Sequence, residues 1–429
     1  MASNLMKQPR RGVSKATYVL VIVVIVIILA AAGFAIVRAR DLKQSQTSTT
    51  SSSSSSTSTT SSLSSSTSST STTSFSLTTS SSSDTSAFVV PGYTSCVDAS
   101  NEISGFTCAS LAQDASAWKP ATNGSLGFSV VFVDASYDYL EQNSQSTLQA
   151  ELNMLLSSGA SCIRIDIGYD AWLQNNVTAQ NELQGFVSQI KSDGKCLVIA
   201  DAGAESYRSS PLPFSQFQVV WQSRVQTLAS LFKPNYYIVI KELSWYAPMI
   251  SDANTNPQVR NATVWSDLAG SLAATVLSVS PQTKIGVAIE GGLSQTQQPL
   301  YVNFLEGVSA QQNISFIGFD PYGQSDLTLF QSIISQIHTT KSLWVAEAWS
   351  TGVDPSTGAQ IMFNPDRAAL DAYWIQVMYY YCLYIHASVL EPFYTDAFSS
   401  YSQTPDFSQR TPVFYWFQHL ATTYGVSLS

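Results

Sequence analysis

The sequence predicts an α/β fold in which eight strands, each followed by a helix, close into a (β/α)8 TIM barrel. Two observations lead to this prediction: short apolar runs that end in an acidic residue recur along the chain, and amphipathic helical stretches separate them. The runs are Gly127–Asp134, Cys162–Asp166, Cys196–Asp201, Tyr237–Glu242, Ile285–Glu290, Phe316–Asp320, Leu343–Glu347 and Ser388–Glu391. Strands that alternate with helices form a parallel sheet, and eight such units in roughly 300 residues favour a closed barrel.

The stretch between the third and fourth runs has a clear helical pattern. Its apolar residues recur at the spacing of one helix face, at Phe214, Phe217, Trp221, Val225, Leu228 and Phe232. Lys233 and Pro234 follow at once and predict the end of this helix. Gly159 and Gly194 precede the second and third runs, where helices are expected to end, because glycine readily takes the left-handed conformation found there.

The chain begins with a segment that is typical of a membrane anchor. Residues 17–37 are apolar over about twenty positions, the length of a membrane span, and basic residues flank them on both sides. We therefore predict a basic cytoplasmic N-terminus at residues 1–16 and a transmembrane or signal-anchor segment at residues 17–37. The alternative is an export signal that is processed, because Arg11-Gly-Val-Ser14 resembles the cleavage site of archaeal prepilin-type signals.

Residues 38–86 predict a disordered, Ser/Thr-rich stalk, and residues 87–429 predict the barrel domain. From position 45 to 86 nearly every residue is Ser or Thr, and such a tract buries too little apolar area to fold. It resembles the O-glycosylated stalks of secreted proteins, although an unmodified flexible linker has the same composition. Anchor and stalk together predict a barrel held outside the cell at its surface, or a secreted barrel if the signal is processed.

The composition argues against several classes of function. Charged residues make up 11% of the chain, against roughly 25% in typical soluble proteins. The net charge is −9 and the globular part has no dense run of Lys and Arg, so no nucleic-acid partner is expected. The five cysteines and three histidines form no CxxC or HExxH pattern, so we expect neither a metal site nor a cofactor.

The cysteines and the glycosylation sequons fit an extracellular location. Cys96 and Cys108 bracket a short segment, a spacing that predicts a local disulfide outside the cell. Cys162 and Cys196 open neighbouring runs, where a bridge and two buried thiols are both compatible with the sequence. Cys382 is expected in the core. Sequons begin at Asn123, Asn176, Asn261 and Asn313.

Two of the strand-end acids are the candidates for catalysis. Glu242 and Glu347 each end an apolar run, and each has a tryptophan close by, Trp245 and Trp349. Cleavage of a sugar linkage with retention needs one nucleophilic carboxylate, one proton-donating carboxyl and flat apolar surfaces for the sugar rings. The ends of barrel strands form one face, and strands four and seven lie three steps apart around it. We therefore predict Glu242 and Glu347 as the catalytic pair.

In these positions the chain resembles the clan A retaining glycoside hydrolases, a group that includes cellulase-, mannanase- and galactanase-like barrels. The resemblance spans about residues 126–425 and implies that Glu242 is the acid/base at the end of strand four and Glu347 the nucleophile at the end of strand seven. Arg164 resembles the strand-two arginine that hydrogen-bonds the nucleophile in many members, and Tyr322 resembles the strand-six tyrosine that contacts the same carboxylate. The chain departs from the clan at Lys241, where members usually have an asparagine that binds the sugar 2-hydroxyl.

Aromatic residues in or just after the strand ends predict a surface for sugar rings, although loop packing is the alternative role for each of them. A barrel mouth so rich in acids disfavours anionic polysaccharides, because like charges repel. The predicted substrate-binding residues are Arg164, Tyr169, Trp172, Asp201, Trp245, Glu290, Tyr322, Trp349 and Tyr394.

The sequence thus predicts a monomeric, membrane-anchored extracellular glycoside hydrolase, an endo-β-glycanase that cleaves β-linked neutral oligo- or polysaccharides by double displacement. A catalytically inactive barrel that binds carbohydrate or serves a structural role at the surface is the alternative, and Lys241 is the argument for it. A third possibility is the solute receptor of a sugar importer, which carries similar anchors and stalks. Receptors of that kind need two lobes and a hinge, and the uninterrupted eightfold pattern disfavours them.

Overall fold

The computed structural model describes the barrel domain and not the N-terminal region. The described residues are 107–133, 144–167, 176–201, 206–349, 352–353, 360–361, 367–392, 395–400 and 406–428. All of them belong to one compact unit, Ser83–Ser429. Several predictions fall outside the described residues: the span at 17–37, the stalk at 38–86, Cys96, Asp134, Tyr169, Trp172 and Tyr394.

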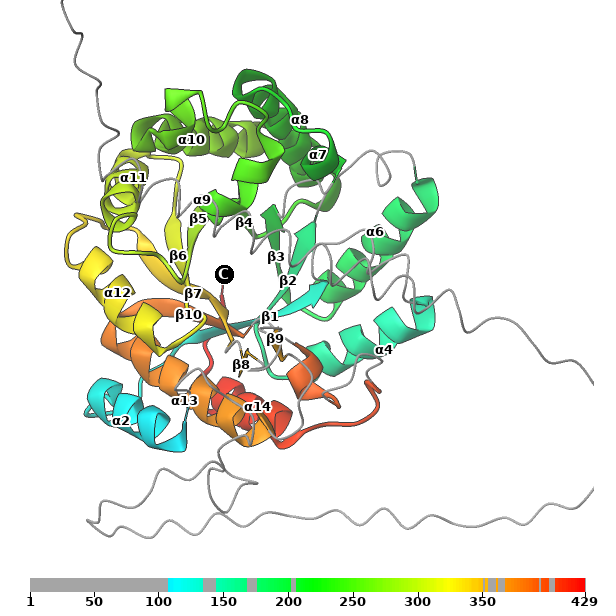
Figure 1. Ribbon diagram of the computed structural model, residues 1–429. Helices are drawn as coiled ribbons and strands as arrows, with labels where there is room; N and C mark the ends of the chain where they lie inside the picture. The colour runs from blue at the N-terminus through cyan, green and yellow to red at the C-terminus, as the bar shows by residue number, and fades with distance from the viewer. Residues whose placement is uncertain are drawn as a thin grey trace, which may run out of the picture. The chain divides into compact units, whose positions relative to one another are not determined.

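Eight parallel strands close into a barrel, which confirms the predicted fold class (Figure 1). The strands are β1 Gly127–Val133, β2 Cys162–Ile167, β3 Cys196–Asp201, β4 Tyr236–Lys241, β5 Lys284–Glu290, β6 Phe316–Asp320, β7 Ser342–Ala348 and β10 Ala387–Pro392. They follow one another around the ring in this order, and β10 pairs with β1 to close it. A short antiparallel pair, β8 Gly352–Val353 and β9 Gln360–Ile361, follows β7 in the sequence.

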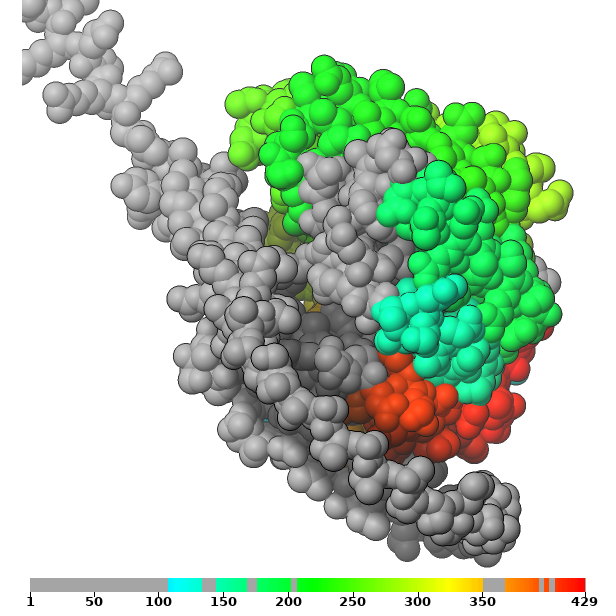
Figure 2. Space-filling model, turned by 90° about the vertical axis from the view of Figure 1, so that its right-hand side faces the viewer, coloured from blue at the N-terminus to red at the C-terminus, as the bar shows by residue number. Residues whose placement is uncertain are grey.

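Helices surround the barrel on its outside (Figure 1). The helices in the described part of the chain are α2 Cys108–Trp118, α4 Gln145–Leu156, α6 Val177–Ser192, α7 Ser206–Ser209, α8 Phe214–Phe232, α9 Leu243–Tyr246, η1 Ala247–Met249, η2 Pro257–Arg260, α10 Ala262–Val279, α11 Gln298–Ala310, α12 Gln324–Ile334, α13 Ala368–Tyr384, η4 Thr395–Phe398 and α14 Pro412–Tyr424. The short α9 follows Glu242 at the end of β4. Figure 2 shows the side that α4 and α6 cover in teal, with the green segment that contains α8 and α10 above them.

Helix α8 shows how the sequence determines these elements. All six residues of its predicted apolar face are buried, and the helix ends at Phe232 as expected. Lys233 follows with a φ of 43°, in the left-handed region, and Pro234 then prevents the helix from continuing. Gly159 and Gly194 also have positive φ values, 84° and 71°, which confirms the two predicted helix ends.

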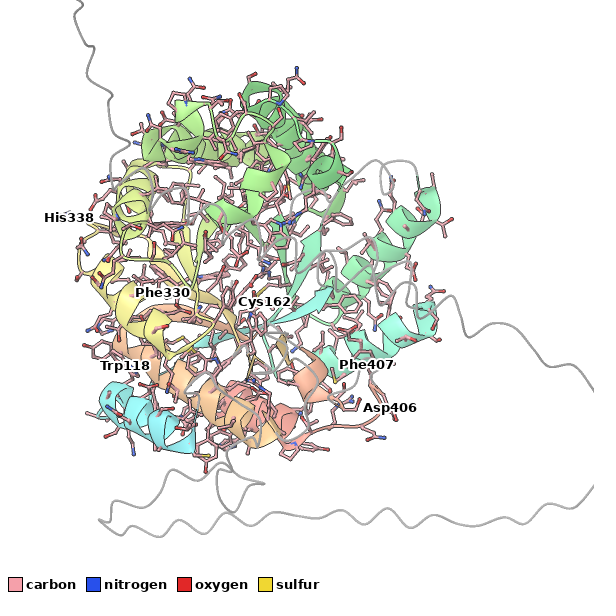
Figure 3. The ribbon with its side chains drawn as sticks, in the orientation of Figure 1. Trp118, Cys162, Phe330, His338, Asp406 and Phe407 are labelled. Carbon is pink, nitrogen blue, oxygen red and sulfur yellow. A yellow bond between two sulfur atoms is a disulfide. The ribbon has the colours of Figure 1, made fainter. Side chains whose placement is uncertain are left out.

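Alternation along the strands separates two apolar layers. Residues that point outward pack under the helices, and those that point inward fill the barrel, because successive side chains of a strand face opposite sides. Near the strand starts the inward layer includes Tyr236, Phe316 and Trp344, with the Phe316 and Trp344 rings stacked at 4.0 Å. A disulfide joins Cys162 to Cys196, which are paired in register (Figure 3). This layer closes the barrel below the strand ends.

Replacement of Trp344 by alanine should lower the free energy of unfolding by about 3–5 kcal/mol, because it empties a site inside the closed barrel. Trp344 is 2% exposed and contacts Phe316 and Tyr236, and the closed strand ring limits how far these neighbours can collapse. Denaturant unfolding at fixed pH measures the change. Tyr415→Ala is the matched control, because Tyr415 is 56% exposed and its loss should change stability by about 0.5 kcal/mol or less. Equal effects of the two variants would contradict this account of the core.

Bulges in β4 and β7 change which side chains point inward at the strand ends. In β4 the register against β5 shifts between Ile238 and Ile240, so Val239 and Ile240 both face the outer layer. Lys241 consequently turns into the barrel. In β7 the register against β10 shifts between Val345 and Ala348, which turns Glu347 inward. Bulges of this kind re-aim side chains next to functional sites.

One helix among the described residues is long and apolar enough to cross a membrane by length and composition. It is α10, Ala262–Val279. This helix is also one of the barrel's outer helices, and its residues Trp265, Leu272 and Val276 are buried in the core. We therefore assign α10 to the helical layer of the barrel.

Candidate active site

Charged side chains converge inside the barrel at the carboxyl ends of the strands. In β2 the alternation turns Arg164 and Asp166 inward, and the same alternation places Asp320 of β6 and Glu391 of β10 on the inner side. Arg164, Asp166, Asp320 and Glu391 are all at most 1% exposed. The barrel mouth is therefore a buried cluster of ionisable groups rather than an apolar core.

Arg164 links four groups in this cluster. Its Nε and Nη2 bond both oxygens of Asp166, and Nη2 also lies 2.6 Å from Glu347 Oε1. Its Nη1 donates to Glu391 Oε1 and to the carbonyl of Ala346, each at 2.6 Å. The predicted contact between Arg164 and the candidate nucleophile is present in this geometry. A guanidinium suits such a role, because its fixed fork of N–H donors can serve several carboxylates at once.

Lys241 is a second cation on the same carboxylate. Its Nζ lies 2.6 Å from Glu347 Oε1 and 2.8 Å from Asp166 Oδ2, and the residue is 8% exposed. The β4 bulge frees the Lys241 amide, which donates to the Tyr246 hydroxyl at 2.9 Å, and that hydroxyl donates to the Asp201 carbonyl. Burial raises the pKa of Asp166, but Arg164 and Lys241 outweigh it and hold that pKa below its ordinary value.

Glu242 stands directly after the β4 bulge, in a strained backbone conformation. Its φ is 55° and ψ 94°, an unfavourable region for a residue with a side chain, and such strain is often found at functional sites. Glu242 is partly exposed, unlike Glu347. Burial, and next the charge of Glu347, raise the pKa of Glu242 from 4.5 to about 7. At neutral pH and below, this carboxyl can hold a proton.

The hydroxyl of Tyr322 joins the two glutamates. It is hydrogen-bonded to Glu242 Oε1 and, at 2.9 Å, to Glu347 Oε2. A phenol has a single proton, so both contacts are satisfied only when one of the carboxyls supplies a proton of its own. Glu347 has two cations on its other oxygen, which favour its charged form, so the proton belongs on Glu242. The two carboxyls therefore differ in protonation, as a general acid and a nucleophile must.

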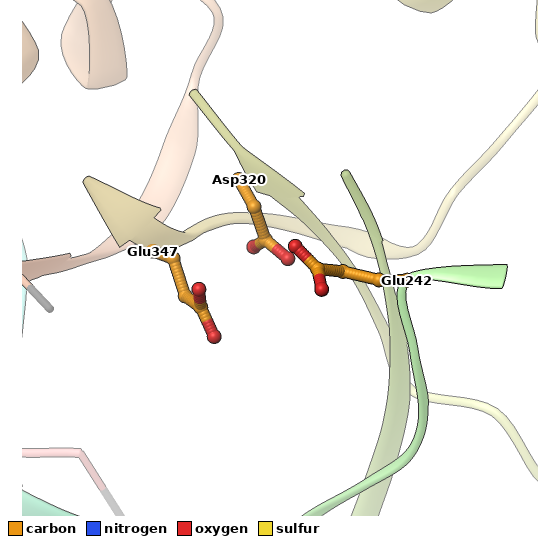
Figure 4. A group of neighbouring side chains, drawn as sticks. All are labelled: Glu242, Asp320 and Glu347. Atoms are coloured by element: carbon orange, nitrogen blue, oxygen red, sulfur yellow. The ribbon is translucent and has the colours of Figure 1, made fainter. Parts of the chain in front are cut away.

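The third acid of this group is Asp320, and Figure 4 shows its carboxyl beside those of Glu242 and Glu347. One oxygen from each of the three residues lies within 4.8 Å of one from each of the others. A distance of this size between Glu242 and Glu347 matches the separation of about 5–5.5 Å typical of retaining glycosidases, and is shorter than the roughly 6.5–9.5 Å of inverting ones.

The other predicted site residues take two kinds of position. Trp349 contacts Tyr322 edge-on, with ring centroids 5.5 Å apart, and so lies next to the tyrosine that joins the two glutamates. Trp245 lies in α9, where the Arg208 guanidinium is 3.9 Å from its ring centroid. Glu290 accepts hydrogen bonds from the Ser244 amide and from the Tyr301 hydroxyl, and thereby holds the turn that follows Glu242.

Asp201 lies away from this group. It is the last residue of β3, and alternation turns it outward, toward α8. Its carboxylate is bonded to Arg224 and accepts a hydrogen bond from Trp221 Nε1 at 3.0 Å, and both partners belong to α8. The structure therefore places Asp201 between the barrel and a helix. Tyr169, Trp172 and Tyr394 lie outside the described residues, and their predicted contacts with substrate stay predictions.

Cys108 is disulfide-bonded, and its predicted partner Cys96 lies outside the described residues. The sequence left a bridge between Cys162 and Cys196 open, and the structure forms it. Cys382 is a free, buried thiol, as expected for a core residue.

The protein should be more stable at mildly acidic than at neutral pH. Burial raises the pKa of Glu391 to about 7, so the folded barrel binds a proton there that the unfolded chain, with a pKa near 4.5, releases. The stabilisation is complete below pH 4.5 and is lost as pH rises to 7, a change of about 3 kcal/mol. Denaturant unfolding of wild type and Glu391→Gln at several pH values measures it. A wild-type curve as flat as that of the variant would contradict this assignment.

No protein-family model matches this sequence, and neither does any curated protein. Solved structures resemble its fold. An endo-1,4-β-mannanase from Rhizomucor miehei is 12% identical, with a TM-score of 0.45 over 64% of this chain and 87% of the mannanase. A β-glucosidase from Thermotoga maritima, in complex with azafagomine, is 11% identical, with a TM-score of 0.46 over 72% of this chain and 100% of the glucosidase. At these identities the likeness concerns the fold alone.

Proposed function

We propose that this protein is a retaining glycoside hydrolase that uses Glu347 as nucleophile and Glu242 as acid/base. The observation that supports it best is the pairing of these two carboxyls, whose oxygens approach within 4.8 Å. Glu347 is paired with two cations, whereas the pKa of Glu242 is raised. Retaining hydrolysis needs this separation and this difference in protonation.

The contacts favour a different role for each oxygen of Glu347. Oε1 is bound by Arg164 and Lys241, whereas Oε2 has the Tyr322 hydroxyl at 2.9 Å, so Oε2 has the lone pair that attacks the anomeric carbon. As that bond forms, the protonated carboxyl of Glu242 gives its proton to the leaving oxygen. Glu242 then takes a proton from water, which attacks the anomeric carbon and releases the sugar with its configuration retained.

We propose further that the substrate is an uncharged glycan, because the acids at the barrel mouth would repel an anionic one. The resemblance of Glu242 and Glu347 to the catalytic pair of the clan A retaining glycoside hydrolases favours a β-linked glycan that is cleaved at internal bonds. The apolar segment at 17–37 and the stalk at 38–86 favour a monomeric barrel anchored to the membrane and exposed outside the cell.

An inactive carbohydrate-binding barrel is the second candidate, and the ion pair between Lys241 and Glu347 favours it. A carboxylate held by two cations is a weaker nucleophile than one held by a single cation, since each cation stabilises the charge that must attack. In this alternative the two carboxyls bind sugar hydroxyl groups without cleaving a bond.

Hydrolysis of defined glycans separates the two candidates. The full-length chain is incubated with β-glucans, mannans, galactans and xylans at several pH values, and reducing ends are counted. Glycosidase activity predicts release that Glu242→Gln and Glu347→Gln both abolish. Binding of a glycan without release, retained by both variants, would support the inactive barrel and overturn the proposed function.

A further inference from the structure

Asp320 is a buried carboxyl to which the two-glutamate mechanism gives no role. It ends β6, and the alternation of Phe316, Gly318 and Asp320 turns its side chain into the barrel. Asp320 is 0% exposed, and Figure 4 shows its carboxyl directed toward Glu242. One of its oxygens lies within 4.8 Å of a Glu242 oxygen and of a Glu347 oxygen. Substrate cannot touch a fully buried group, so any effect on catalysis must act through its neighbours.

Neither oxygen of Asp320 has a hydrogen-bond partner in the described part of the chain. Of the two cations nearby, Lys241 is paired with Asp166 and Glu347, and Arg164 with these two and Glu391. An ionised carboxylate without donors, buried beside another carboxylate, costs far more than a neutral carboxyl in the same place. Burial and then the charges of Glu347 and Glu242 accordingly raise the pKa of Asp320 well above its ordinary value.

A neutral carboxyl has an O–H that needs an acceptor, and the nearest carboxyl oxygens belong to Glu242 and Glu347. The Glu347 carboxylate is already bound by two cations and Tyr322, whereas the Glu242 carboxyl has the single Tyr322 contact among the described hydrogen bonds. Glu242 alone gives up and regains a proton during the proposed reaction, whereas Glu347 forms and loses an ester bond. An ionised Glu242 is therefore the acceptor that Asp320 is placed to serve.

We propose that Asp320 is a positioning residue, a permanently protonated carboxyl that donates a hydrogen bond to Glu242 whenever Glu242 is ionised. This inference rests on the proposed function for its role in turnover. In the first step Glu242 gives its proton to the leaving oxygen, and the Asp320 O–H then bonds the new carboxylate. In the second step Glu242 regains a proton from water and the bond is released. Asp320 keeps its own proton throughout, so no further proton donor or acceptor is required.

The groups that face this pair come from four strands and one loop. They are Arg164 from β2, Lys241 from β4, Glu290 from β5, Glu347 from β7 and Tyr322 directly after β6. Of the carboxyls in the cluster, Glu242 and Glu391 have a pKa raised to about 7. Well above pH 7 both are ionised, so a protonated carboxyl that persists there belongs to Asp320.

Infrared spectroscopy tests the inference without any substrate. The full-length chain, labelled with ¹³C at the aspartate side-chain carboxyl, is titrated from pH 5 to pH 9 while the C=O stretch of protonated aspartic acid is followed. The isotope separates Asp320 from the glutamates. We expect one labelled band that persists at pH 9 and moves to lower frequency, with a midpoint near 7, as Glu242 ionises. Asp320→Asn should remove the band, and Glu242→Gln should keep it but abolish its shift.

Asp201→Asn is the matched control, because Asp201 is equally buried but is bonded to Arg224, so its loss should leave the band unchanged. No labelled band at pH 9, a band that survives Asp320→Asn, or a shift that survives Glu242→Gln would each overturn the inference. These outcomes do not depend on hydrolysis, so a failure of the proposed function is seen separately, in the glycan assay.

Turnover supplies a second readout, in which kcat/KM reports the first step. On a glycan, whose leaving oxygen needs the proton of Glu242, Asp320→Leu should lower kcat/KM about tenfold, because the hydrogen bond that stabilises the forming Glu242 carboxylate is lost. On a dinitrophenyl β-glycoside of the released sugar, whose leaving group departs without a proton, kcat/KM should stay nearly unchanged. Asp320→Asn, which keeps an N–H donor, should restore kcat/KM on the glycan. Equal losses on both substrates in both variants would show a merely structural role and overturn the inference.

Discussion

Glu347→Ala should lower the rate of glycoside cleavage on the order of 10⁴- to 10⁶-fold, the scale of losing a catalytic nucleophile in other hydrolases. The Glu347 carboxylate, which the structure holds between Arg164, Lys241 and Tyr322, is the nucleophile of the proposed reaction. Steady-state kinetics on a dinitrophenyl glycoside of the released sugar measures the loss. KM should change far less than kcat, because the attack occurs after binding.

Azide gives this prediction its control. A small anion can enter the space left by the Glu347 side chain and attack the anomeric carbon from the same side, which forms a glycosyl azide of inverted configuration. Glu242→Ala with azide should instead give the retained azide, because Glu347 still forms the glycosyl-enzyme and azide replaces the activated water. Unchanged activity of Glu347→Ala would rule out Glu347 as the nucleophile, and the same anomer from both variants would rule out the division of roles.

Glu242→Gln should lower the rate by about 10²–10⁴-fold on glycans, the range for losing a general acid. The loss should shrink on substrates with an activated aryl leaving group, which departs without a proton. In wild type the rate should fall as pH rises through about 7, because Glu242 must be protonated and its pKa is raised to about 7. The pH dependence of kcat/KM on a poor and an activated leaving group measures both effects.

Glu290→Gln is the matched control for this variant, because it also removes a charge from a strand end but leaves Glu242 in place. The fall of kcat/KM at alkaline pH should remain in Glu290→Gln, whereas it should vanish in Glu242→Gln. If kcat/KM of Glu242→Gln still fell at alkaline pH, the titrating acid would be another residue, which would contradict the role of Glu242.

The period of a strand makes much of this site predictable. In β2, Cys162, Arg164 and Asp166 face inward, and the same count turns Asp201 of β3 outward to Arg224. The prediction from sequence chose acids by their place at a strand end and did not use the alternation of side chains. It therefore placed Asp201 among the substrate-binding residues and left Asp320 and Glu391 out of the predicted site. All three assignments were available from the alternation of apolar residues in the runs.

The remainder of the site depends on backbone irregularities that the sequence does not announce. A regular β4 would turn Ile240 inward and Lys241 outward, and the bulge at Val239 reverses both. The bulge in β7 likewise turns Glu347 into the mouth. The contact of Lys241 with Glu347 follows from these two bulges together, so the sequence identified Lys241 as a departure from the clan but not as a partner of the nucleophile.

The stereochemistry of the first product tests the central claim most directly. The full-length enzyme and the most reactive glycan are mixed in D₂O, and proton NMR follows the anomeric signals before mutarotation mixes them. Attack by Glu347 from within about 5 Å of Glu242 predicts that the β anomer appears first and that Glu347→Gln produces neither anomer. First appearance of the α anomer would require a water between the carboxyls and would contradict the account.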